Sequence, residues 1–159
     1  MAAIIFALLL FFIFALNFRQ RLPAASGVGG NVVSESEVVE FLGDFNEARE
    51  RAFTERKPLI IFFTLAGNES CKRSFELFRN QEIKKLTKYF ICATVDGIAA
   101  PQTCEKYRVN GFPTVLILDG AGKEIQRLTG KETKEQLSIQ MHIAIQLSTT
   151  NTTNNKNLK

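Results

Sequence analysis

The most restrictive feature of the sequence is a short run near its middle, Leu59-Ile60-Ile61-Phe62-Phe63, in which every side chain is apolar. A strand with one face in water alternates apolar and polar residues, so an unbroken apolar run predicts a strand that is covered on both faces. Pro58 comes directly before the run and marks the end of the preceding helical pattern. Central strands of this kind are typical of α/β sheets with helices on both sides.

Helical and strand patterns alternate on either side of this run. Apolar residues from Phe41 to Phe53 recur at helical spacing and predict a helix there. Further helices are expected at residues 69–79, around Ile83 and Leu86, and at 101–107. Further strands are expected at residues 89–95, 115–118 and 124–128, the last two joined by the turn sequence D-G-A-G into a hairpin. Within residues 131–147, apolar residues recur at every second position from Ile139 to Leu147, as in a strand. The length of the segment and its good helix formers nevertheless favour a helix.

The two ends of the chain differ from this middle part. Residues 2–18 are almost continuously apolar and would reach about 25 Å as a helix, enough for a tilted membrane span. The sequence leaves two alternatives open for the segment 1–18, an uncleaved anchor or a signal peptide cleaved near Ala24-Ala25-Ser26. Residues 19–36 are typical of a flexible linker, and residues 149–159 of a disordered polar tail. The folded domain is therefore predicted at residues 37–148.

Composition excludes several classes of function. The chain has 20 Lys and Arg against 16 Asp and Glu, for a net charge of +4, and the two signs are interleaved, which argues against a nucleic-acid partner. Its three cysteines, Cys71, Cys92 and Cys104, are widely spaced, and no pair has the C-x-x-C spacing of zinc sites. His142 is the single histidine. We therefore expect no metal and no cofactor. Cys92 is expected in the core, and a Cys71–Cys104 disulfide is disfavoured.

Two segments carry a resemblance to a known family: K-P-L-I-I-F-F-T-L-A-G-N-E-S-C-K and E-K-Y-R-V-N-G-F-P-T-V-L-I-L-D-G-A-G-K. Together with the element order they resemble the thioredoxin superfamily from about Asp44 to Leu147. They are most similar to membrane-associated and periplasmic thioredoxin-like proteins akin to the C-terminal domain of thiol:disulfide interchange reductases. The resemblance implies an α/β thioredoxin fold with a central mixed sheet of about four to five strands flanked by helices.

The same resemblance identifies an active-site loop, Gly67-Asn68-Glu69-Ser70, that departs from the family pattern F-x-A-x-W-C-x-x-C-K. Gly67 takes the place of the Trp and Asn68 that of the first Cys, while Cys71 matches the second Cys. The first cysteine is the attacking nucleophile in this family, so two-step dithiol exchange is not expected. Asn is also a favoured N-cap residue, and its side chain is expected to accept from a backbone N–H near Ser70 or Cys71.

The second segment implies a peptide-binding groove. Pro113 matches the cis-proline of the family, and Phe112, Pro113 and Thr114 are the residues expected to bind an extended peptide. Phe62 stands where many thioredoxins have a buried Asp. The recognition part of the site is therefore expected to be present, whereas the nucleophile is not.

Two functions remain open from the sequence. The favoured one is a membrane-tethered or exported binding module that holds a protein or peptide partner beside Pro113. The alternative is a thiol–disulfide oxidoreductase that acts through the single thiol of Cys71 on a thiol protein. Residues 2–18 would provide the membrane contact. Family habit favours an extracytoplasmic domain, in the periplasm or secretory lumen, while Arg19 and Arg21 favour a cytoplasmic-facing one.

Overall fold

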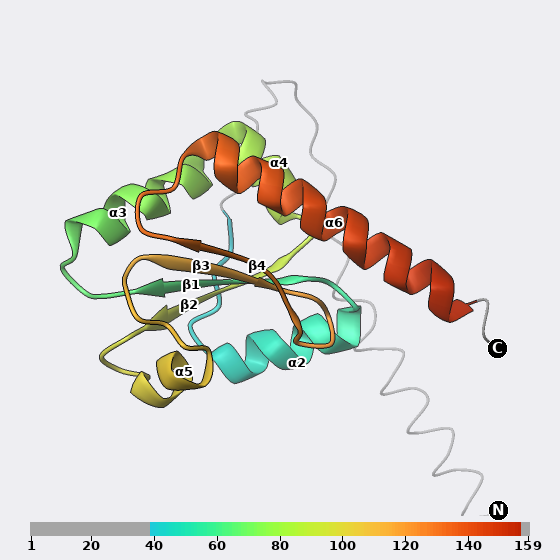
Figure 1. Ribbon diagram of the computed structural model, residues 1–159, viewed down its shortest axis with the longest axis horizontal. Helices are drawn as coiled ribbons and strands as arrows, with labels where there is room; N and C mark the ends of the chain where they lie inside the picture. The colour runs from blue at the N-terminus through green and yellow to red at the C-terminus, as the bar shows by residue number, and fades with distance from the viewer. Residues whose placement is uncertain (1–38, 157–159) are drawn as a thin grey trace, which may run out of the picture. The chain divides into compact units, whose positions relative to one another are not determined.

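The computed structural model describes residues 39–156, with side chains described as far as residue 150 (Figure 1). The predicted anchor or signal segment 1–18 and the predicted linker 19–36 lie outside the described residues. Within the described part, no helix combines the length and the apolar character that crossing a membrane requires.

The described part alternates helices and strands in the predicted order. The helices are α2 (Phe45–Glu55), α3 (Glu69–Glu76), the 3-10 helix η1 (Leu77–Arg79), α4 (Gln81–Thr87), α5 (Pro101–Lys106) and α6 (Lys134–Lys156). The strands are β1 (Leu59–Thr64), β2 (Ile91–Asp96), β3 (Thr114–Leu118) and β4 (Glu124–Thr129). They form one mixed sheet in the order β2-β1-β3-β4, with β1 parallel to β2 and antiparallel to β3. The predicted α/β thioredoxin fold is confirmed, with four strands.

The central strand β1 is buried on both faces, as its unbroken apolar sequence predicts. Ile60 and Phe62 belong to one core cluster, and the residues that alternate with them, Leu59, Ile61 and Phe63, belong to the other. Figure 1 shows α3, α4 and α6 covering one face of the sheet and α2 and α5 covering the other. Each face of β1 therefore has its own hydrophobic core, which fixes the register of the whole sheet.

Helix α6 shows why strict apolar alternation was misleading. Leu137, Met141 and Ala144 are fully buried and recur at the spacing of one helical face. Ile139, which a strand would place on the same face as Met141, is 56% exposed. The helix also continues to Lys156, so the prediction of a disordered tail from residue 149 is wrong up to that point.

Two smaller expectations are corrected. Phe41 is not in the first helix; it lies in a segment that bridges to β2 through Leu42, and its ring packs 5.0 Å from those of Phe75 and Phe78. Phe53 does lie in α2, as its spacing predicts, and is 69% exposed. The second strand begins at Ile91 rather than at residue 89, because residues 88–90 still turn away from α4.

Candidate functional site

The loop between β1 and α3 carries the predicted active-site residues. Gly67 has a φ of 78°, in the left-handed region that glycine adopts at least cost. Asn68 then caps α3: its Oδ1 accepts from the backbone N–H groups of Ser70 at 2.9 Å and Cys71 at 3.1 Å. The predicted N-cap role of Asn68 is confirmed by these two bonds. The carboxamide oxygen is thus committed to its own helix.

Glu69 is the first residue of α3, and its carboxylate is paired within the helix. Its carboxylate is exposed and accepts from the Lys72 Nζ at 2.6 Å. That hydrogen bond lowers the pKa of Glu69, with the charges of Lys72 and Arg73 adding to the effect. A carboxylate in the first turn also suits the positive end of the helix dipole. The first turn of α3 is therefore stabilised by ordinary helix-terminal interactions.

Cys71 lies further along the first turn of α3 and faces inward. Its side chain is 2% exposed and belongs to the same core cluster as Phe62 and Phe78. The thiol is free, without a disulfide. A buried cysteine surrounded by aromatic rings packs as a small apolar side chain.

The other two cysteines are buried at separate places. Burial raises the pKa of the Cys92 thiol to about 12. Burial also raises the pKa of Cys104, helped by the negative charge of Asp96. Cys104 belongs to the core cluster on the opposite face of the sheet from Cys71, and both thiols are free. The sheet therefore separates the two cysteines that a disulfide would have to join.

Asp96 is a site residue that the sequence analysis missed. It ends β2, and its carboxylate accepts from the backbone N–H groups of Ile98 at 2.8 Å, Ala99 at 3.2 Å and, across the chain, Ala66 at 3.2 Å. These backbone donors, Ala99 and Ile98 before Ala66, hold the pKa of Asp96 below its usual value. Asp96 thus ties the loop of Asn68 to the loop after β2. An Asp before a Gly at the end of a strand was the available signal.

The third loop at this end of the sheet carries Pro113. The Phe112–Pro113 peptide bond is cis, and Thr114 begins β3 opposite Phe63 of β1. The Pro113 carbonyl accepts from the Gly130 N–H at 3.0 Å. Among the described residues, by contrast, none hydrogen-bonds to the backbone N–H or carbonyl of Phe112. Both backbone polar groups of Phe112, in the two successive peptide units before Pro113, therefore lack a protein partner in the described part of the chain.

The Phe112 ring joins this loop to that of Asp96. A Cβ atom placed on Gly97 would lie 2.3 Å from the Phe112 Cζ and 3.2 Å from a methyl carbon of Leu65. Only a glycine at position 97 leaves room for the ring. Beside it, Ile98 is 73% exposed, the most exposed of the large apolar side chains in the described part. In the third loop Phe112 is partly exposed, while Pro113 and Thr114 are buried, so Ile98 is the large apolar side chain that this end of the sheet presents to solvent.

A cavity of about 390 Å³ opens on the other side of the Asn68 loop. Its walls come from β1, β2 and α3, with Gly67 at the rim: Phe62, Thr64, Leu65, Ala66, Gly67, Asn68, Cys71, Lys72, Phe75, Glu76 and Thr94. Phe62 brings an apolar ring to it, where the resemblance implies a buried Asp in many thioredoxins. No group of three His, Cys, Asp or Glu residues suited to a metal ion occurs within residues 39–156.

Comparison with known proteins supports the resemblance. The profile of the family described as "Thioredoxin-like domain" matches residues 45–144, more than half of the chain. A search among functionally curated proteins finds no match. Similar solved structures include a thioredoxin from Thermus thermophilus, with 19% identity and a TM-score of 0.58 over 65% of this chain and 85% of that one.

Two further structures show the same likeness. A thioredoxin from Trypanosoma brucei brucei is 19% identical, with a TM-score of 0.57 over 74% of this chain and 99% of that chain. The DsbH oxidoreductase is 21% identical, with a TM-score of 0.52 over 72% of this chain and 87% of that chain. Identities this low establish the shared fold alone.

Proposed function

Because the chain belongs to the thioredoxin-like domain family, we propose that it is a thioredoxin-like binding module, which holds an extended peptide or partner protein beside Pro113 without dithiol turnover. The observation that carries the proposal is the identity of residue 68 and the hydrogen bonds that its side chain makes. The family pattern has a cysteine nucleophile there, and this chain has an asparagine whose side chain is engaged by Ser70 and Cys71 of its own helix.

The recognition half of the proposal is supported by Phe112 and Ile98. The unpaired backbone of Phe112 offers one N–H and one carbonyl to a peptide that adds alongside it as a strand. The exposed side chain of Ile98 offers apolar contact at the same end of the sheet. A partner of this surface is an unfolded or extended segment with apolar side chains.

The competing function is thiol exchange through Cys71 alone. One observation favours it: Cys71 is among the residues that line the cavity of about 390 Å³ beside the Asn68 loop. With a side chain only 2% exposed, Cys71 is nevertheless poorly placed to attack a protein disulfide.

Reduction of insulin by dithiothreitol separates the two functions. We expect no catalysis by the wild type or by Cys71→Ser, and clear catalysis by Asn68→Cys, since the first thiol would then stand at the helix N-terminus. Asn68→Ser is the matched control, because serine has the size of cysteine and caps helices well but supplies no sulfur. Wild-type catalysis that disappears in Cys71→Ser would establish the competing function instead.

Peptide capture needs its own measurement. The probe is reduced and alkylated insulin B chain, which cannot take part in disulfide exchange, and binding is followed by NMR shifts of the loops around Pro113. Ile98→Ser should weaken binding about tenfold, a typical effect of removing one apolar contact. Ile139→Ser is the control, since Ile139 is also exposed but lies on α6. Equal losses in both variants would contradict the proposed surface.

The tether is the last part of the proposal. We propose that residues 2–18 hold the domain at a membrane or direct its export, with the domain on the extracytoplasmic side. An exposed cysteine introduced as Lys131→Cys, in a chain whose own three cysteines are buried, reports the side directly. Labelling by a membrane-impermeant maleimide is expected in intact cells for a cell-surface or periplasmic domain, and in isolated vesicles only after the membrane is opened for a domain in a secretory lumen. Labelling once the plasma membrane alone is permeabilised would place the domain in the cytoplasm.

A further inference from the structure

The end of the domain opposite the candidate site is rich in cations. Pro58 precedes β1 and the Asn68 loop follows it, so the two ends are separated by the length of a six-residue strand, about 20 Å. Five cations gather at the Pro58 end, and we call this group the basic end: Arg51, Arg56, Lys57, Lys84 and Lys88. Two carboxylates, Glu40 and Glu55, contact members of it.

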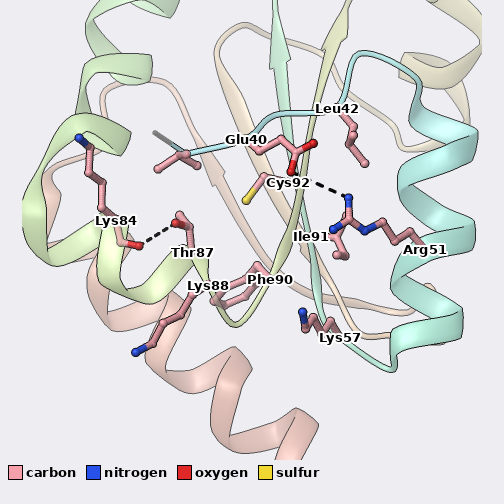
Figure 2. Close-up of a pocket in the computed structure, with 11 residues that line it drawn as sticks. Glu40, Leu42, Arg51, Lys57, Lys84, Thr87, Lys88, Phe90, Ile91 and Cys92 are labelled. Atoms are coloured by element: carbon pink, nitrogen blue, oxygen red, sulfur yellow. Dashed lines mark hydrogen bonds and ion pairs between the residues drawn. The ribbon is translucent and has the colours of Figure 1, made fainter. Parts of the chain in front are cut away.

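A cavity of about 240 Å³ lies at the centre of the basic end (Figure 2). Figure 2 shows Arg51 reaching in from α2 toward Glu40 of the entering segment, with Lys84 and Lys88 on the α4 side. Arg51 is 2.7 Å from Glu55 and 4.0 Å from Glu40, and Lys57 is 2.8 Å from Glu55. Lys84 and Lys88 form no ion pair with a described carboxylate, so the positive charge on the α4 side is uncompensated.

A second hollow of about 280 Å³ adjoins the first, since Lys57 and Lys88 line both. Its other walls are largely apolar and include Pro58, Tyr89 and Ile145. Tyr89 is 47% exposed, and the Lys88 Nζ lies 5.0 Å from the centre of its ring. The basic end thus combines cations with an exposed aromatic ring beside an apolar hollow.

The chain itself leads from this surface toward its apolar N-terminal run. Val39, the first described residue, lines the same cavity as Lys84 and Lys88. The sequence before Val39 contains the apolar run 2–18, and fewer than 25 residues separate the two. Whatever their arrangement, the 20 residues 19–38 reach at most about 70 Å, so a membrane contact of residues 2–18 would leave the basic end within that distance of the bilayer.

We infer that the basic end is a docking surface for an anionic phospholipid bilayer. The inference rests on the proposed tether and extends it to the orientation of the domain. Lipid headgroups supply dispersed negative charge to the cations, and the headgroup–acyl boundary is the environment that an amphipathic ring such as that of Tyr89 prefers. The cations are spread around two hollows rather than converging on one point, which fits a charged surface better than a single small anion. Docked in this way, the loops of Asn68 and Pro113 face away from the bilayer.

Single tryptophans test this orientation, because the chain contains none of its own. The full chain is reconstituted into vesicles of phosphatidylcholine, with or without phosphatidylglycerol, that carry brominated acyl chains as quenchers. Tyr89→Trp reports on the basic end and Ile98→Trp on the candidate site. We expect quenching and a blue shift of the indole at position 89 only in the anionic vesicles, and no quenching at position 98 in either.

Removing positive charge tests whether the cations of the basic end cause the docking. Lys84→Gln with Lys88→Gln, in the Tyr89→Trp background, should lower the ratio of docked to free domain by roughly 25-fold, about fivefold for each cation. Lys106→Gln with Lys131→Gln removes the same charge from exposed residues elsewhere and should leave the ratio within about twofold. Docking through Lys84 and Lys88 should also weaken steeply between about 0.1 M and 1 M salt, as the Debye length shrinks from about 10 Å to 3 Å.

Four outcomes would overturn the inference. The first is equal quenching at position 89 in neutral and anionic vesicles, and the second is quenching at position 98. The third is an equal loss of docking in the two double charge variants. The fourth is release of the domain by millimolar inorganic phosphate or by RNA, which would assign the cations to a soluble anion or to nucleic acid. Binding of the alkylated insulin B chain is measured on the Tyr89→Trp samples, in which Ile98 is unchanged. It reports on the Pro113 surface alone, so failure of docking and failure of the proposed peptide binding are distinguishable.

Discussion

The two sides of the candidate site use their polar groups in opposite ways. On the helix side, the Asn68 oxygen is bonded to two N–H groups of α3 and the Cys71 sulfur is buried against aromatic rings. On the strand side, the backbone of Phe112 has no partner among the described residues, and Ile98 beside it is 73% exposed. One side satisfies its groups internally, while the other leaves groups available to a partner.

This difference indicates that the loops around Asp96 and Phe112 are held independently of the residue at position 68. The helix side contributes to stability through a cap and a buried core, and neither requires a thiol at position 68. The strand side is held by Asp96 and by the packing of Phe112 on Gly97, and neither contact involves sulfur. The geometry of the loops around Asp96 and Phe112 therefore does not depend on which residue stands at position 68.

The largest expected effect concerns sulfur reactivity. Burial raises the pKa of Cys92 to about 12, so the native thiol carries almost no thiolate at pH 8 and its alkylation should be at least about a hundredfold slower than in the unfolded chain. Cys71 should be slow as well, because a side chain that is 2% exposed is sterically shielded. Mass spectrometry of iodoacetamide-labelled peptides measures each cysteine separately. Rapid labelling of native Cys71 would contradict the difference between the two sides, since the helix side would then also offer a reactive group.

The next largest effect concerns the strand side. Gly97→Ala should destabilise the domain by about 1–3 kcal/mol in urea unfolding, because its Cβ would overlap the Phe112 ring. The same displacement should weaken binding of the alkylated insulin B chain. Gly111→Ala is the control: nothing lies within 4 Å of its Cβ, and its cost should stay within about 0.5 kcal/mol. Similar costs for the two variants would mean that Phe112 is not held by Gly97.

Much of the fold follows from local sequence patterns, and the departures have physical causes. The apolar run of β1 predicts its burial on both faces because no other environment accepts five such side chains in a row. Residues 137–147 were ambiguous because isoleucine and leucine fall on both the buried and the exposed side of α6, and only packing against the sheet decides between them. The continuation of α6 through a run of Thr and Asn runs against intrinsic helix propensity.

The site was only partly predictable for a similar reason. The cap of Asn68 is a local interaction over two and three residues, which a sequence pattern contains. The bond from Ala66 to Asp96 spans 30 residues, and the contact of Phe112 with Gly97 spans 15. Such contacts exist only once β1, β2 and β3 are aligned, so residue spacing alone does not reveal them. Of the basic end, the sequence shows Lys84 and Lys88 as near neighbours, on α4 and directly after it. Arg51, Arg56 and Lys57 come from α2 and the segment after it, and join them only in the folded domain.

The third prediction compares two caps. Asn68→Ala should cost about 1 kcal/mol of unfolding free energy, since it removes two hydrogen bonds at the start of α3. Asn80→Ala at the start of α4 removes a single bond, to the Glu82 N–H, and should cost less. Thermal and urea unfolding of both variants give the comparison. If Asn68→Ala proved neutral, the cap would not explain why an asparagine occupies position 68.

The smallest effect is the pH dependence due to Asp96. Its pKa is lowered in the folded state, chiefly by the N–H groups of Ala99 and Ile98 and also by that of Ala66, so the charged form is favoured by folding. The stabilisation is therefore fully present above the unfolded value of about 4 and is lost as the pH falls through the folded value. Asp96→Asn, which accepts hydrogen bonds but does not titrate, should lower stability at pH 7 and flatten the decline between about pH 5 and pH 3, as measured by urea unfolding. An unchanged slope would show that Asp96 does not tie the helix side to the strand side through its charge, and the two sides would then be independent.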